Sequence, residues 1–126
     1  TLEAKYTIEA LQQAISHAGG GNLCGTIHHS DRGVQYCCDE YITLLKEHHI
    51  RISMTEDSNP TDNGMAERVN GIIKNEFLEP LQTPKNLLEA LPLVDHAVRT
   101  YNTLRPHLNL NMRTPAQVYE GKQIIL

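Results

Sequence analysis

Two short segments with strand character, separated by sequence of helical spacing, constrain the fold of this chain most. Residues 23–28 and 50–55 are rich in apolar and β-branched side chains, and residues 37–48 repeat apolar positions every three to four residues. Helices that flank short buried strands are typical of a parallel or mixed sheet in an α/β fold. Two strands cannot form a sheet that is covered on both faces. We therefore expect the sheet to continue outside this sequence or in a partner chain.

Five helices are predicted around these strands. Thr7 is a suitable N-cap for the first helix, which we expect to end at the glycines of residues 19–21. The second helix covers residues 37–48, and the third runs from about Thr61 to Leu78. The buried side of the third helix is predicted to consist of apolar residues at helical spacing, namely Met65, Val69, Ile72, Ile73 and Phe77.

The C-terminal half of the sequence carries clear helix-start signals. Thr83 and Pro84 suit the N-cap and N1 positions of a long helix that ends at Arg105–Pro106. Pro92 lies inside that helix and predicts a kink or a break, because proline removes a helical hydrogen bond and clashes with the preceding turn. Residues 114–117, Thr-Pro-Ala-Gln, form a capping box that opens a last short helix.

Length and composition bound the class of protein. A chain of 126 residues suits one domain with a modest core. We expect residues 1–82 to form the α/β part, residues 83–126 a helical extension, and the polar loop 56–63 to be the least ordered internal segment. No apolar run approaches the ~20 residues of a membrane-spanning helix. Three cysteines, two of them adjacent, cannot form a complete disulfide framework, which favours a reducing compartment.

The charge distribution argues weakly against a nucleic-acid-binding protein. The net charge is −4 and the pI is about 5.9. Residues 1–60 carry 4 basic and 8 acidic side chains, whereas residues 61–126 carry 7 of each. If DNA binds, local patches on the second half must bind it, helped by metal ions or by missing segments.

Two carboxylates stand out as candidate metal ligands. Asp31 follows the first predicted strand, at the carboxyl end where α/β folds place ligands. Glu67 lies in the first turns of the third predicted helix. Mg²⁺ prefers oxygen ligands and is usually held by one or two carboxylates together with substrate phosphates. On spacing alone, however, a helix with a polar face is more often simply exposed to solvent.

The polar side of the third predicted helix forms one stripe. Asn63, Glu67, Asn70, Gly71 and Lys74 follow the spacing of one helix face. Lys74 would lie where a phosphate backbone could pass. Glycine in a helix costs about 1 kcal/mol relative to alanine, so Gly71 is consistent with the close approach of another molecule.

The residues around these carboxylates resemble the integrase core of bacterial insertion-sequence transposases. The resemblance is to the insertion-sequence-three family, which is related to retroviral integrases, and it extends from His28 to Tyr119. It rests on blocks that occur in order, namely His-His-Ser-Asp-Arg-Gly-Val-Gln-Tyr at 28–36, Ser-Met-Thr at 53–55, Asn-Pro-x-Asp-Asn-Gly-Met-Ala-Glu-Arg-x-Asn-Gly-x-x-Lys-x-Glu at 59–76, Tyr-Asn-x-x-Arg-Pro-His at 101–107 and Thr-Pro at 114–115.

This resemblance implies a ribonuclease-H-like fold and a catalytic triad of two Asp and one Glu. In the family 35 residues separate the second Asp from the Glu, and 35 residues separate Asp31 from Glu67 here. The first Asp of the family lies on an upstream strand, and neither Glu3 nor Glu9 matches it. With no initiator Met, the chain is therefore expected to be the C-terminal part of the core, lacking the first three strands.

The resemblance also implies an activity and its partners. The intact protein would be a DNA transposase in which three carboxylates hold two Mg²⁺ or Mn²⁺ ions for strand cleavage and strand transfer, with Asp31 and Glu67 as catalytic metal ligands. The partners would be transposon ends, target DNA and further copies of the protein, in the cytoplasm of a bacterium at its nucleoid. Residues expected to contact DNA are Asn63, Arg68, Asn70, Lys74, Arg105 and His107.

Several alternatives remain open at this point. The same fold could carry a hydrolytic nuclease, or the chain could be a non-catalytic remnant that binds DNA or oligomerises. Arg105 and His107 could cap a helix and shape a loop instead of contacting phosphate, and Arg68 could serve a structural carboxylate. Zinc binding is disfavoured because the candidate ligands occur as adjacent pairs (His28, His29, Cys37, Cys38, His48, His49). A nucleophilic role for Cys37 or Cys38 is disfavoured too.

The missing strands lead to two further expectations. The chain alone should be inactive and should bind Mg²⁺ weakly, because the third carboxylate and the DNA phosphates are absent. An open strand edge should favour association of two copies, which would bury Ile27, Ile50 or Ile52.

Overall fold

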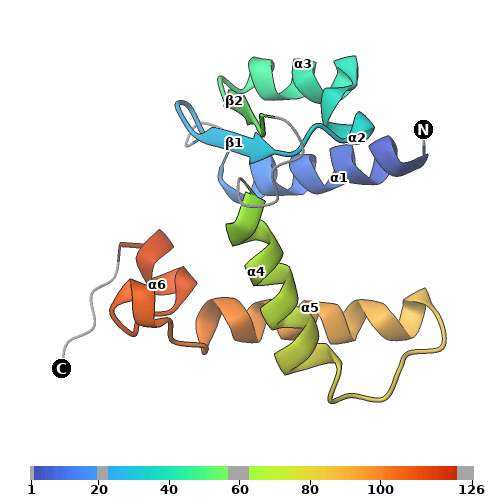
Figure 1. The fold of residues 1–126 in the computed structure, drawn as a ribbon, viewed down its shortest axis with the longest axis vertical. Coiled ribbons are helices and arrows are strands. Elements are labelled where there is room, and N and C mark those ends of the chain that lie inside the picture. The colour runs from blue at the N-terminus through green and yellow to red at the C-terminus, as the bar shows by residue number, and fades with distance from the viewer. Residues whose placement is uncertain (1, 20–22, 57–62, 122–126) are drawn as a thin grey trace. The chain divides into compact units, whose positions relative to one another are not determined.

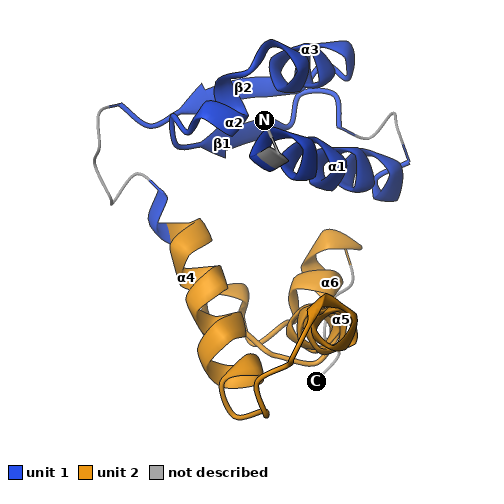
Figure 2. Ribbon diagram, turned by 90° about the vertical axis from the view of Figure 1, so that its right-hand side faces the viewer, with its two compact units in different colours: residues 1–64 blue, residues 65–126 orange. Residues whose placement is uncertain are grey.

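The computed structural model describes residues 2–19, 23–56 and 63–121. Contacts divide the chain into two compact units, unit 1 (residues 1–64) and unit 2 (residues 65–126), which are blue and orange in Figure 2. Because a compact unit need not coincide with a domain, the expected boundary near residue 82 stays a prediction. The loop expected to be least ordered falls mainly on residues 57–62, which lie outside the described residues.

Unit 1 combines helices with a pair of strands (Figure 1). In chain order the elements are α1 (Leu2–His17), β1 (Ile27–Ser30), α2 (Val34–Cys37), α3 (Asp39–Glu47) and β2 (Arg51–Met54). The strands pair in parallel, in a register that sets Ile27 opposite Arg51 and Ser30 opposite Met54. The structure thus confirms the α/β pattern with parallel strands.

The first helix of unit 1 is longer than the sequence pattern predicts. It begins at Leu2, so the assignment of Thr7 as its N-cap is wrong. The Thr7 hydroxyl instead donates a hydrogen bond to the carbonyl of Glu3, 2.8 Å away. Threonine is tolerated inside a helix when its hydroxyl bonds back to the preceding turn, and Ala4 and Lys5 upstream are good helix formers.

The boundaries of β1 and of the second predicted helix also differ. β1 begins at Ile27 instead of residue 23, because residues 23–26 form a turn closed by a hydrogen bond from the amide of Thr26 to the carbonyl of Leu23. Gly25 supplies the positive φ of +82° that this turn requires. The predicted helix 37–48 is divided into α2 and α3 at Cys38, whose backbone is extended.

The core of unit 1 lies between α1, α3 and the start of β2. It consists of Ile8, Leu11 and Ile15 on α1, Tyr41 and Leu45 on α3, and Ile50. Because Ile50 is already buried, the expectation that it would be available for association is wrong. Ile27 and Ile52 are exposed, at 57 % and 37 % of their surface.

Leu45 is the residue whose loss should cost this core most. Its side chain is 1 % exposed, so Leu45→Ala should lower the free energy of unfolding of unit 1 by about 2–5 kcal/mol through lost burial and an unfilled cavity. Val34→Ala removes apolar atoms from a side chain that is 73 % exposed and should change it by less than about 0.5 kcal/mol. Urea titration of both variants measures the difference. Equal effects would contradict this description of the core.

The regular elements in the described part of unit 2 are helices. Its elements are α4 (Gly64–Ile72), the π-helical segment η2 (Ile73–Leu78), α5 (Leu87–Thr103), the 3₁₀ segment η3 (Leu108–Leu110) and α6 (Pro115–Tyr119), with Gly64 itself counted in unit 1. The third predicted helix is therefore present, with an unpredicted change to π geometry at Ile73. Its expected start at Thr61 lies outside the described residues. No helix of the described chain is long and apolar enough to cross a membrane.

One prediction for the helix starts of unit 2 is wrong and one is narrowed. Asn86 rather than Thr83 caps α5, because its side-chain oxygen accepts a hydrogen bond from the amide of Glu89 at 3.0 Å. The helix continues through Pro92, so there is no break, and the alternative of a kink stays a prediction. Two further predictions are confirmed. The helix ends at Thr103, as the Arg105–Pro106 signal predicts, and Thr114 forms the predicted capping box with Gln117.

Met65 does not belong to a buried face, contrary to prediction. Its side chain is 83 % exposed, whereas Val69, Ile72, Ile73 and Phe77 are half-buried. Met65 is the second residue of α4 and the first of unit 2, so it lies at the end of the helix and not at its packed centre.

Candidate functional site

Asp31 follows β1 directly, as predicted, and its carboxylate is exposed. The Oδ1 atom accepts a hydrogen bond from the amide of Gly33 at 2.8 Å, which closes a turn after the strand. Oδ2 has no partner of this kind among the described residues. The carboxylate is therefore oriented by the backbone and keeps one oxygen free for a ligand.

The loop that carries Asp31 is tied to the end of β2. The amide of Thr55 donates to the carbonyl of Ser30 at 3.0 Å, and the Nε atom of Arg32 donates to the carbonyl of Thr55 at 2.8 Å. Ser30 and Thr55 are both buried. Arg32 thus has a structural task that the sequence pattern did not indicate.

An aromatic cluster joins β1 to α2 and α3 close to Asp31 in the chain. The Nε2 atom of His28 and the hydroxyl of Tyr41 are 2.8 Å apart, and the rings of Tyr36 and Tyr41 meet edge to face at 5.5 Å. Burial raises the pKa of Tyr41 to about 12 and lowers the pKa of His28 below its ordinary value of 6.5. Zinc binding by His28 was disfavoured from the sequence, and this contact between β1 and α3 gives the residue a packing role.

The lowered pKa of His28 predicts a pH dependence of stability. Between its folded pKa and 6.5, the unfolded chain binds more protons than the folded chain. Stability should therefore fall as the pH falls from 6.5 through the folded pKa, and change no further from this group below it. Urea titrations of the 126-residue chain across this range should show the loss in the wild type and a smaller loss in His28→Gln. His96→Gln, at an exposed histidine of α5, serves as the control and should keep the wild-type profile.

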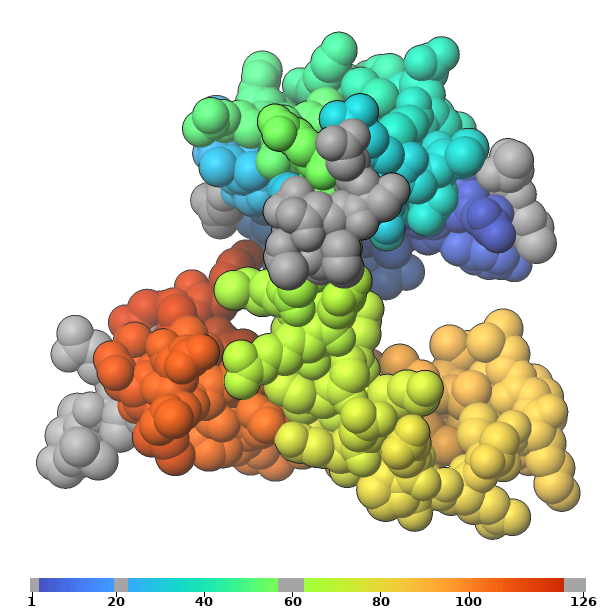
Figure 3. Space-filling model, in the orientation of Figure 1, coloured from blue at the N-terminus to red at the C-terminus, as the bar shows by residue number. Residues whose placement is uncertain are grey.

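The residues of the predicted polar stripe lie on α4 and η2, except Asn63, which precedes α4. Glu67, Asn70 and Lys74 are exposed, and Asn63 and Gly71 are half-buried. In the space-filling view, the side chains of this segment form an open strip on the surface of unit 2 (Figure 3). Because Asp31 belongs to unit 1 and Glu67 to unit 2, the convergence of their carboxylates stays a prediction.

Arg105 is bound to a carboxylate that the sequence pattern did not single out. Its Nε atom donates to Oε2 of Glu76 and its Nη2 atom donates to Oε1, each at 2.8 Å. This two-point contact joins η2 to the end of α5. It lowers the pKa of Glu76 and raises that of Arg105. Glu76 is part of the sequence block at 59–76, but sequence alone gave no reason to pair it with Arg105.

His107 supports the other side of the Arg105 guanidinium. Its Nδ1 atom lies 3.3 Å from Nη1 of Arg105. Because a guanidinium can only donate, Nδ1 must accept, and the proton of the neutral ring is on Nε2. Burial lowers the pKa of His107 most, and the charge of Arg105 lowers it further. Both effects agree with a neutral ring. Nε2 is buried and has no hydrogen-bond partner in the described part of the chain.

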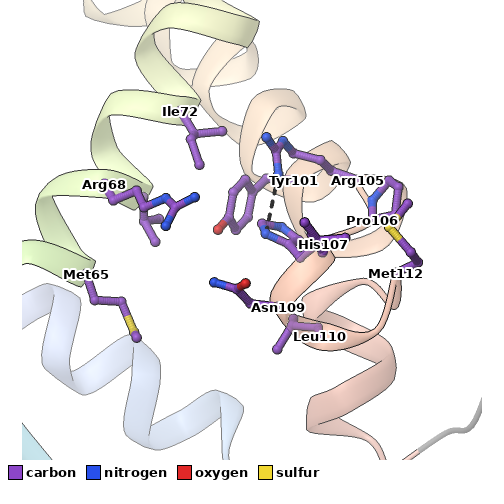
Figure 4. A pocket seen from close by; sticks show the side chains of 12 residues that line it. Met65, Arg68, Ile72, Tyr101, Arg105, Pro106, His107, Asn109, Leu110 and Met112 are labelled. Atoms are coloured by element: carbon purple, nitrogen blue, oxygen red, sulfur yellow. Dashed lines mark hydrogen bonds between the residues drawn. The ribbon is translucent and has the colours of Figure 1, made fainter.

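A pocket of about 510 Å³ lies beside this group, entirely within unit 2 (Figure 4). Its polar lining includes Arg68, Arg105 and His107, whose labelled side chains project from α4 and from the segment after α5. Apolar side chains such as Met65 and Val69 form much of the rest, and no acidic residue lines it. In the described residues, no group of three or more His, Cys, Asp or Glu side chains is placed to hold a metal ion.

Comparison with known families identifies the chain. The model of the integrase core domain family matches residues 48–115. The chain belongs to the integrase core domain family. The matched region contains Glu67, Lys74 and Glu76 together with Arg105 and His107, and it begins after Asp31.

Curated relatives are insertion-sequence proteins of bacteria. The chain is 32 % identical over 117 residues to the transposase for insertion sequence element IS629 of Shigella sonnei, which covers 93 % of this chain and 38 % of the relative. It is 36 % identical over 89 residues to the putative transposase InsK for insertion sequence element IS150 of Escherichia coli, with coverages of 71 % and 31 %. The chain thus spans about a third of the length of the relatives it matches.

Solved structures agree in fold. The HTLV-2 integrase catalytic core domain in complex with magnesium is 29 % identical, with a TM-score of 0.67 over 91 % of this chain and 68 % of that one. The matched chain of a simian T-cell lymphotropic virus intasome is 23 % identical, with a TM-score of 0.74 over 98 % and 42 %. The ribonuclease-H-like fold class is confirmed.

Proposed function

We propose that this chain forms part of the catalytic core of a DNA transposase that cleaves and joins DNA strands with the help of divalent metal ions. The observation that carries the proposal is an exposed Asp31 at the end of a parallel strand and an exposed Glu67 on a helix, with 35 residues between them, in an integrase core. The insertion-sequence relatives point to transposition. The partners would be transposon ends, target DNA and further copies of the protein.

The donor chemistry of the two carboxylates fits Mg²⁺ or Mn²⁺. Asp31 has one oxygen oriented by Gly33 and one free, and Glu67 is exposed on α4. Oxygen ligands of this kind are those that Mg²⁺ prefers, and a solved relative contains magnesium. When bound, the metal ions would lower the pKa of an attacking hydroxyl and stabilise the leaving oxygen. Asp31 and Glu67 would hold them, with Arg32 and Thr55 keeping the Asp31 loop in place.

The side chains around Glu67 suit contact with a DNA backbone. Lys74 and Arg68 are exposed cations that make no ion pair in the described part of the chain, and Asn70 and Asn63 offer neutral donors. Contacts of this kind to phosphates position DNA without reading its sequence. Arg105 and His107 are more fully engaged by Glu76 and by each other, so we assign them a smaller direct share of DNA binding.

The catalytic proposal is tested in the protein that contains this chain together with its neighbouring sequence. Asp31→Asn and Glu67→Gln should each abolish Mn²⁺-dependent cleavage and strand transfer on a transposon-end duplex, while circular dichroism stays unchanged. Asp39→Asn and Glu79→Gln remove exposed carboxylates elsewhere and should leave activity near wild type. Activity retained by Asp31→Asn would overturn the assignment. Cleavage without joining in the wild type would indicate a hydrolytic nuclease instead.

The 126-residue chain by itself should be inactive and should bind Mg²⁺ weakly, because two carboxylates without a third acid or a phosphate leave most of the coordination shell to water. Isothermal titration with Mn²⁺ measures this. Micromolar affinity that is lost in Asp31→Asn, or cleavage of DNA by the isolated chain, would contradict the expectation.

Lys74 should contribute one phosphate contact. Lys74→Ala should weaken binding to DNA of any sequence and reduce the slope of log K against log salt by about 0.9, the value for one released counterion on duplex DNA. Fluorescence anisotropy over a salt series measures both quantities. Lys85→Ala removes an exposed lysine outside the stripe and should leave the slope unchanged. An unchanged slope in Lys74→Ala would place the DNA elsewhere.

A further inference from the structure

The π segment η2 is an unusual feature that requires a physical cause. Within it the amide of Glu79 donates to the carbonyl of Lys74 at 2.8 Å, a bond that spans five residues instead of four. π geometry is rare and occurs mostly as single turns inside α-helices. A regular α-helix would instead pair the Glu79 amide with the carbonyl of Asn75. Some contact from outside the helix must favour the wider turn.

The two-point contact between Glu76 and Arg105 is placed to supply that cause. Glu76 lies within the turn that the Lys74–Glu79 bond closes, and both of its carboxylate oxygens are held by Arg105. The side chains of Arg105 and Glu76 are 25 % and 47 % exposed, so the contact is partly shielded from solvent on the arginine side. Fork-to-fork contacts between arginine and a carboxylate have a fixed geometry that a lysine cannot reproduce.

The Arg105 guanidinium is itself held by its surroundings. Its central carbon lies 6.0 Å from the centre of the buried Tyr101 ring, and its Nη1 atom contacts His107. The backbone amide of His107 in turn donates a hydrogen bond to the carbonyl of Arg113 at 3.0 Å. Arg105 therefore presents a fixed fork to Glu76, and the turn of η2 must adjust to it.

We propose that Arg105 is a positioning residue that acts through Glu76 to hold the π turn and thereby sets the placement of Lys74. The carbonyl of Lys74 is the acceptor of the bond that defines the turn, and the side chains of Lys74 and Glu67 are both exposed, on η2 and on α4. The consequence for DNA binding rests on the proposed function. The structural part, that Arg105 maintains the π turn, does not depend on it.

Scalar couplings across hydrogen bonds, measured by NMR in the isotope-labelled 126-residue chain, test the structural part, because they identify the carbonyl that accepts from the Glu79 amide. The wild type should show the coupling to the Lys74 carbonyl. Glu76→Gln and Arg105→Lys should each lose it, whether the amide then pairs with the Asn75 carbonyl or stays open. The charge-reversed pair Glu76→Arg with Arg105→Glu restores a fork and should recover much of the coupling. Arg99→Lys is the matched control, because Arg99 pairs with Asp95 at 3.0 Å on α5, away from the Glu76 carboxylate. An unchanged coupling to Lys74 in Arg105→Lys would overturn the proposal.

A double-mutant cycle tests the consequence for DNA. Arg105→Lys keeps the positive charge, so a loss of DNA affinity in this variant should come from a displaced Lys74 and should disappear when the Lys74→Ala substitution is already present. Equal losses with and without Lys74→Ala would show that Arg105 contacts DNA directly, and would overturn the positioning role in DNA binding.

Failure of the proposed function has a different signature. If the wild type and Lys74→Ala bind DNA equally, Lys74 is no DNA contact and the proposed function loses support. The coupling of the Glu79 amide to the Lys74 carbonyl still decides whether Arg105 holds the turn.

Discussion

The parallel pairing of β1 with β2 is the constraint on which the arrangement of unit 1 depends. Its register places Ser30 beside Met54, so the loops that follow the two strands leave the sheet side by side. The hydrogen bonds of Thr55 and Arg32 then join these loops, and Asp31 is oriented by the amide of Gly33. A parallel pair needs a crossover between its strands, and α2 and α3 provide it. The core leucine and tyrosine of α3 lie on that crossover.

Unit 2 uses polar contacts to fix the ends of its helices. Asn86 begins α5, Thr114 begins α6, and Arg105 joins the end of α5 to η2. Between α5 and α6, the bridge between His107 and Arg113 closes residues 107–113 into a loop. Glu67 and Lys74 therefore lie on a helical segment, α4 followed by η2, whose C-terminal end is held by the contact between Glu76 and Arg105 as well as by apolar packing.

Signals that act within a few residues were readable from the sequence. The capping box at Thr114 was readable because its donors and acceptors are three residues apart. The start of β1 was not readable from the sequence, because the apolar character of Leu23 does not distinguish a strand from a turn. The contact of Glu76 with Arg105 was hidden for a different reason. The two residues are 29 positions apart, and only tertiary structure brings them together. The meeting of Asp31 and Glu67 depends on the placement of two units and remains an inference from the family.

The contact between Glu76 and Arg105 has a consequence for sequence divergence. If either partner changed alone, the other would be left as an unpaired charge. Simultaneous loss of both would leave a regular helix end with ordinary polar residues. Positions 76 and 105 should therefore covary. In descendants of this sequence, an acid at the first should accompany an arginine at the second, and the two should disappear together.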